Sequence, residues 1–136
     1  MTRRLFCACL AIALGLGVAG RALADKYPKL APYTAVRWKG DAPEVEVGDR
    51  FYRLRSIDRV TVDEIVDFAK KTYEGRWRKR LSEDLVQVMT EMGHPPGDKV
   101  TLRLADIDSK SEIVRVEAMT HENRQKVWRA NQKGGI

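Results

Sequence analysis

Cysteine is nearly absent from this 136-residue sequence, and both cysteines, Cys7 and Cys9, lie within the first ten residues. A chain cleaved after Ala24 would contain no thiol and no disulfide, which excludes zinc ribbons, iron–sulfur sites, thiol proteases and thioredoxin-like chemistry. Long apolar runs are lacking too. The run from Leu5 to Val18 is about 14 residues, whereas a membrane-spanning helix needs ~20, so we expect no retained membrane anchor.

Side chains suited to catalysis are also scarce. The chain has only two histidines, His94 after a predicted helix and His121 in the first turn of another, and we interpret both as structural or solvated. Residues 106–110 match the first two acidic positions of a calcium loop but lack its glycine and distal glutamate, so they predict a turn. We therefore predict no catalytic residue, no metal site and no cofactor. A small hydrolase using His94 or His121 is the third of our three functional hypotheses.

The first 24 residues have the pattern of an export signal, with two arginines, an apolar run and the small residues Ala22-Leu23-Ala24 before a predicted cleavage at Asp25. Thr2-Arg3-Arg4-Leu5-Phe6 resembles the twin-arginine pattern, and a general secretory signal is the alternative. We expect the domain to work in a bacterial periplasm or outside the cell. The chain after Ala24 carries 22 basic and 19 acidic residues, a modest net charge of +3.

The rest of the chain predicts one small α+β domain over residues 34–132, after an extended lead-in over residues 25–33 and before a flexible tail over residues 133–136. A short strand is expected near residues 35–38. Residues 44–47 and 50–57 alternate on both sides of Gly48-Asp49, which is typical of a β-hairpin.

Two helices and a second hairpin follow. Thr61 and Glu64 form a capping box before a helix that ends near Gly75. An apolar stripe predicts one continuous helix from Trp77 to Met92. Residues 99–105 and 112–118 predict a second hairpin with Val114, Val116 and Ala118 facing inward, and residues 121–132 predict a last helix. The expected fold is a mostly antiparallel sheet of two hairpins packed against two central helices, plus a C-terminal helix.

Two stretches resemble the PDZ domains of exported bacterial proteins. Residues 54–62 are similar to the family's strand and turn before its helix, and Pro96-Gly97-Asp98-Lys99-Val100-Thr101-Leu102 is similar to the motif that opens the strand after it. The resemblance implies a sheet-and-helix core that binds an extended peptide by strand addition.

Our leading hypothesis is therefore a non-enzymatic module that binds a peptide or an envelope protein between the first hairpin and the first helix. The residues expected to bind it are Phe51, Arg53, Arg55, Val62 and Ile65.

A basic cluster on the second predicted helix supports an alternative hypothesis. Arg76, Arg78, Lys79 and Arg80 surround Trp77, which starts the apolar stripe and is expected to face the core. The basic side chains would then face solvent and bind an anionic envelope polymer or a lipid surface. We expect no nucleic-acid partner for an exported domain, and the pattern leaves the oligomeric state open.

Overall fold

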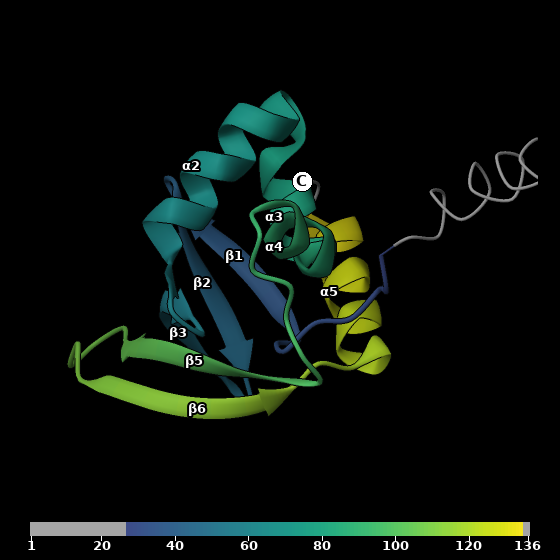
Figure 1. The fold of residues 1–136 in the computed structure, drawn as a ribbon. Coiled ribbons are helices and arrows are strands. Elements are labelled where there is room, and N and C mark those ends of the chain that lie inside the picture. Colours follow the sequence, from purple (N-terminus) through teal and green to yellow (C-terminus); the bar gives the residue numbers. More distant parts are fainter. Residues whose placement is uncertain (1–26, 135–136) are drawn as a thin grey trace, which may run out of the picture.

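The computed structural model describes residues 27–134 (Figure 1). The predicted signal peptide, its cleavage position and the last two residues lie outside this range. Within it, no helix is both long enough and apolar enough to cross a membrane.

Six strands form one antiparallel sheet, and the expected α+β architecture is confirmed (Figure 1). The order is β1-β2-β3-β5-β6, and the short β4 pairs with β3. Both predicted hairpins are present, and Gly48 has the positive φ of 65° that the first turn needs. The strands are β1 Ala35–Lys39, β2 Ala42–Val47, β3 Arg50–Ile57, β4 Val60–Thr61, β5 Lys99–Asp106 and β6 Glu112–Ala118.

The helices gather on one side of the sheet, and α5 lies along β1 (Figure 1). Thr61 caps α2 as predicted, since its hydroxyl accepts from the Glu64 amide at 3.3 Å. A 3₁₀ turn at Glu74–Arg76 joins α2 to α3. The helices are α2 Val62–Tyr73, α3 Trp77–Glu83, α4 Leu85–Glu91 and α5 His121–Gly134, so the last helix extends two residues beyond the predicted end.

The prediction of one continuous helix from Trp77 to Met92 is wrong. The helix breaks at Asp84, whose φ and ψ are −123° and 45°. The apolar stripe survives the break, because Leu81 and Leu85 are both fully buried on its two sides. The break positions two carboxylates inside a group of polar side chains that we call the polar junction. Its members are Lys29, Arg80, Ser82, Glu83, Asp84, Arg124 and Asn131.

The predicted inward face of β6 is also wrong. Val114 and Val116 are 55% and 64% exposed. The register decides this, because the buried Leu102 of β5 lies opposite Arg115, so the odd-numbered residues of β6 share its face. Alternation alone identified two faces in β6 but not which one meets the core.

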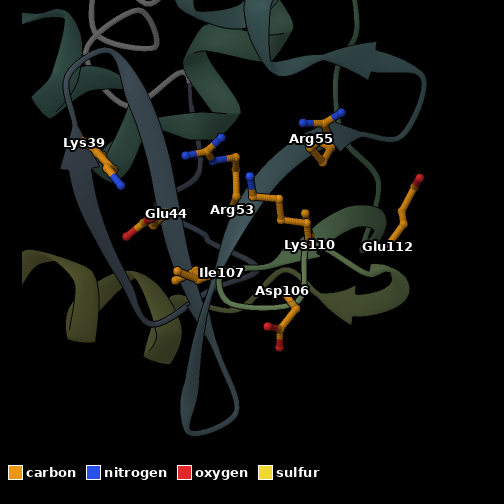
Figure 2. Close-up of a pocket in the computed structure, with 9 residues that line it drawn as sticks. Lys39, Glu44, Arg53, Arg55, Asp106, Ile107, Lys110 and Glu112 are labelled. Atoms are coloured by element: carbon orange, nitrogen blue, oxygen red, sulfur yellow. The ribbon is translucent and has the colours of Figure 1, made fainter.

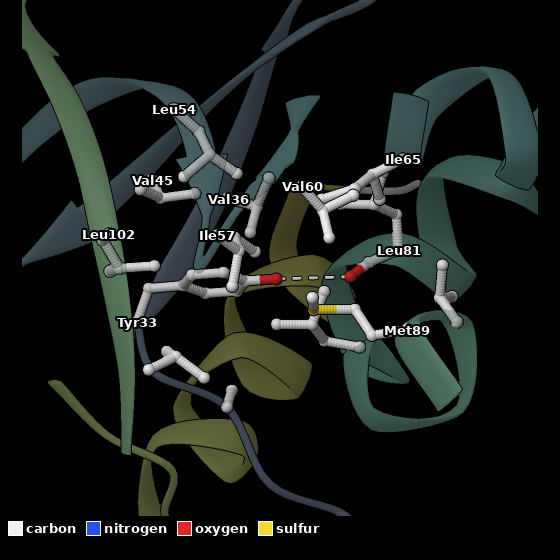
Figure 3. Close-up of a cluster of buried hydrophobic side chains, with 14 of the residues drawn as sticks. Tyr33, Val36, Val45, Leu54, Ile57, Val60, Ile65, Leu81, Met89 and Leu102 are labelled. Atoms are coloured by element: carbon white, nitrogen blue, oxygen red, sulfur yellow. Dashed lines mark hydrogen bonds between the residues drawn. The ribbon is translucent and has the colours of Figure 1, made fainter. Parts of the chain in front are cut away.

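The lead-in belongs to the core instead of preceding it. Ala31 and Thr120 exchange backbone hydrogen bonds of 3.0 and 3.1 Å. Tyr33 is 1% exposed, and its hydroxyl donates to the Leu81 carbonyl at 3.2 Å (Figure 3). Burial raises the pKa of the Tyr33 phenol far above its usual range. The strand residues around it, including Val45, Leu54 and Leu102, fill the space between sheet and helices (Figure 3).

Candidate functional site

The face of the sheet opposite the helices carries a hollow of about 360 Å³ that we call the basic hollow (Figure 2). Its floor comes from β3 and β5, and its walls come from the end of β1 and the turn between β5 and β6. The lining residues are Lys39, Glu44, Arg53, Arg55, Ala105, Asp106, Ile107, Lys110 and Glu112.

Residues 107–111 form the turn that the sequence predicts between β5 and β6, and the Asp106 side chain stabilises it. One carboxylate oxygen of Asp106 accepts from the amides of Asp108 and Ser109 at 2.9 and 3.0 Å. Those backbone hydrogen bonds hold the pKa of Asp106 below its usual range, with a smaller contribution from Arg50. Lys110 then takes a positive φ of 62°, and the turn lines the hollow with Ile107 and Lys110.

Each carboxylate in the hollow is already paired with an arginine that does not line it. Arg37 binds Glu44 at 2.6 Å, and the Glu44 side chain is only 8% exposed. In the same way, Arg50 binds Asp106 at 2.7 Å and Arg103 binds Glu112 at 2.9 Å. No carboxylate of the hollow is therefore left to neutralise its own cations.

Four cations in the hollow have no ion-pair partner among residues 27–134. They are Lys39, Arg53, Arg55 and Lys110. In Figure 2 the Arg53 and Lys110 side chains lie near the centre, and the Lys39 amine points toward Arg53. Unpaired cations are common on an exposed surface. These four differ because three separate segments bring them to one concave site, where like charges repel unless an anion binds between them.

A second hollow, of about 770 Å³, adjoins the first and shares Lys39, Arg53 and Arg55 with it. We call it the notch. It lies between β2 and α2, where Leu54, Val62 and Val66 supply apolar surface. Its remaining lining residues are Asp41, Ala42, Pro43, Thr61, Asp63, Asp67 and Lys70.

The notch exists because β2 and β4 occupy the same side of β3 without meeting. The last described pair of β2 with β3 is Glu44 with Arg53, and the first of β4 is Thr61 with Ser56. Leu54 and Arg55 therefore have no strand partner on this side, and the register shift between β3 and β5 falls at the same place. This gap in the strand pairing borders the notch, where Arg55 is exposed and Leu54 is buried.

Of the five residues predicted to bind a peptide, the structure brings three together. Arg53, Arg55 and Val62 line the notch. Phe51 lies instead under Arg37, whose guanidinium is 4.2 Å from the ring centroid, and Ile65 is fully buried in the core.

Near Phe51, β3 has a strand partner on the β2 side only, because its pairing with β5 begins at Tyr52. β2 pairs with Phe51 and Arg53 on one side, and β5 pairs with Arg53 on the other, so β3 is an inner strand. A peptide cannot add along an edge that is already paired, which leaves two short gaps in the pairing of β3, at Arg50 and Phe51 on the β5 side and at Leu54 and Arg55 on the β2 side.

The basic cluster on α3 is partly neutralised. Arg78 donates to the Gly40 carbonyl at 2.9 Å and contacts Asp41, and Arg80 binds Asp84 at 3.0 Å. Arg76 and Lys79 are exposed and have no ion-pair partner among the described residues. Trp77 is half-buried, with its ring edge-to-face against Trp38 at 5.1 Å.

The two histidines lie at helix ends and form no shared site in the structure. His94 is exposed, and its backbone amide donates to the Met89 carbonyl at 2.8 Å. His121 Nδ1 lies 3.1 Å from the Lys29 carbonyl, and its Nε2 lies 3.2 Å from Gln125. In the part of the chain that the structure describes, no three His, Cys, Asp or Glu side chains are grouped as metal ligands would be.

Comparison with protein-family models, with curated proteins and with solved structures finds no match to this chain. The resemblance to PDZ domains therefore stays a prediction. Sequence reasoning missed Lys39, which ends β1, and Lys110, which lies in the turn between β5 and β6, because only the folded sheet brings them beside Arg53. Their position next to turn residues was the one available signal.

Proposed function

We propose that this protein is a non-enzymatic binding module whose ligand is an extended acidic segment of another protein. The convergence of Lys39, Arg53, Arg55 and Lys110 in one hollow carries the proposal. An acidic side chain in the hollow would supply the ion-pair partner that these four cations lack among residues 27–134.

The adjoining notch favours a peptide over a small free anion. Arg55 is exposed there and has no β2 or β4 partner, so an extended backbone can bind beside the hollow. Ala42 and Val62, both partly exposed, offer apolar surface for a neighbouring side chain. The ligand we expect has an acidic residue over the hollow and an apolar residue over the notch.

The charge balance of the hollow favours one or two acidic side chains over a long polyanion. Its lining holds four cations and three carboxylates, and the notch adds Asp63 and Asp67 on its far wall. A polymer with a negative charge on every unit would extend past the four cations and be repelled by these carboxylates. Because residues 1–24 have the pattern of an export signal, we place the proposed partner in the periplasm or outside the cell.

Fluorescence anisotropy with labelled eight-residue peptides tests the proposal. One set alternates Glu or Asp with Leu or Val, and a matched set carries Gln or Asn at the acidic positions. We expect the purified chain to bind acidic peptides at least tenfold more tightly than their amides, with a loss of affinity as salt rises. Arg53→Gln with Arg55→Gln should weaken binding at least tenfold.

The matched control is Arg76→Gln with Lys79→Gln, which removes the same charge from exposed positions at the start of α3 and in the turn before it, and should change affinity less than twofold. Equal binding of acidic and amide peptides would refute the proposal. Heparin or phosphatidylglycerol vesicles that bind more tightly than every peptide, and that lose affinity in the α3 variant, would establish the polyanion alternative instead.

A further inference from the structure

β6 is an open edge of the sheet. In the described residues it pairs with β5 only, until Thr120 pairs with Ala31 just beyond its end. The opposite edge differs, because α5 packs against β1. The amide of Met119 donates to Asp98 on the β5 side, so strand alternation directs the backbone groups of Val114, Val116 and Ala118 toward the open edge.

This edge lacks three of the usual protections against pairing with another chain, although the charged Arg115 and Glu117 share the face of the core residue Leu102. Open edges commonly carry lysine, proline or a bulge, and β6 reads Glu-Ile-Val-Arg-Val-Glu-Ala with none of them. Val114 and Val116 are the two most exposed large aliphatic side chains of the described residues. Such an edge favours a strand from a second molecule.

The charges of β6 are complementary to β6 itself. An antiparallel pair of β6 strands about a two-fold axis at Val116 keeps the two faces of the sheet aligned. It places Arg115 opposite Glu117 of the second copy, twice over, and Val114 opposite Ala118. A shift of the axis to Arg115 would bring like charges together, and a shift to Val114 would place Arg115 opposite Ile113.

We propose that β6 is a self-association surface, at which two copies of this chain join their sheets with Val116 beside its counterpart. The exposed valines of both copies would then cover one another on the outer face. The two basic hollows would open on the same side of the joined sheet, so the dimer would present two binding sites to one partner surface.

Charge exchange tests the register. Sedimentation of the full chain at ~0.1 mM should show a dimer, which Arg115→Glu alone or Glu117→Arg alone dissociates at least tenfold more readily. The double variant should restore it, because each new pair is again opposite in sign. A monomeric parent, or single variants that dimerise like the parent, would overturn the proposal.

Disulfide trapping reports the pairing of two β6 strands independently of the charge variants, and so still tests it if those variants fold poorly. In a chain carrying Cys7→Ser and Cys9→Ser, Val116→Cys should form a covalent dimer on oxidation, because paired Cα atoms lie about 5.5 Å apart. Val114→Cys is the matched control, since its two copies would be four residues out of register, roughly 13 Å apart. Equal cross-linking of the two variants, or none in either, would contradict the two-fold pairing at Val116.

Discussion

The two charged clusters of this domain differ in how their charges are compensated. In the polar junction, the side chains of Glu83 and Asp84 are only 2% and 6% exposed, and cations or amides surround both. Lys29 binds Asp84 at 2.5 Å and Asn131 donates to Glu83 at 2.8 Å. In the basic hollow, four cations converge, and each of the three carboxylates that line it is bound to an arginine outside the lining.

The contrast separates charges that hold the fold from charges available to a ligand. Removing Arg124 from the polar junction leaves the buried Glu83 with no cation within ion-pair distance among the described residues, which is costly. Removing a cation from the hollow only relieves repulsion. The same residue type, arginine, should therefore have opposite consequences at Arg124 and at Arg53.

The largest expected effect is at Arg124, whose guanidinium lies 3.8 and 3.7 Å from the carboxylates of Glu83 and Asp84. Arg124→Met keeps much of the side-chain volume but removes the charge, and should lower the free energy of unfolding by about 3 to 5 kcal/mol. Urea denaturation measures it. Lys126→Met on the same helix is the control and should cost less than about 0.5 kcal/mol. Similar losses in both variants would show that the junction is not a buried charge network.

A smaller loss of stability is expected at Trp77. Its burial tests whether the basic residues around it flank a packed side chain or a surface open to a ligand. Because Trp77 is half-buried against Trp38, Trp77→Ala should cost about 2 to 3 kcal/mol, below the ~3 to 5 kcal/mol of a fully buried aromatic. The thermal midpoint reports the change. A midpoint like that of the parent would mean that Trp77 is a surface residue open to a ligand of Arg76 and Lys79.

The sequence predicts local features of this fold better than features that depend on distant contacts. The capping box at Thr61 and the Gly48-Asp49 hairpin were predictable because local hydrogen bonds and turn geometry decide them. The break at Asp84 was not, because its partners Lys29 and Arg124 lie about 55 and 40 residues away along the chain.

The candidate site divides in the same way. Arg53 and Arg55 could be chosen from strand alternation, and Val62 from its place at the start of α2. Lys39 and Lys110 required the sheet order and the turn held by Asp106. Ile65 was misassigned because a helical stripe shows which residues are apolar, but not which of them reach a groove.

High pH probes a third kind of buried polar group, a neutral phenol. The pKa of Tyr33 is raised by burial, so the unfolded chain ionises near pH 10 while the folded chain does not. Stability is therefore intact below pH 10 and falls above it, by up to about 1.4 kcal/mol per pH unit for one group. Tyr33→Phe should remove this share of the slope and cost about 1 kcal/mol at neutral pH. An unchanged slope would place the Tyr33 phenol in solvent.

The smallest effect on stability is expected in the hollow. Arg53→Gln with Arg55→Gln should change the free energy of unfolding by no more than about 0.5 kcal/mol, because neither guanidinium has an ion-pair partner in the described residues. Urea denaturation beside the Arg124 variant makes the comparison direct. If the free energy of unfolding fell by more than about 2 kcal/mol, these arginines would be stabilising the fold instead of being available to a ligand, and the proposed site would lose its basis.

NMR mapping of an acidic peptide shows directly whether the basic hollow and the notch bind it. As a Glu-containing octapeptide is titrated into the ¹⁵N-labelled chain, the amide signals of Arg53, Leu54, Arg55 and Lys110 should shift together and saturate. The amide-substituted peptide should leave them in place. Shifts centred on Arg76 and Lys79, or none near β3 at millimolar acidic peptide, would contradict the account.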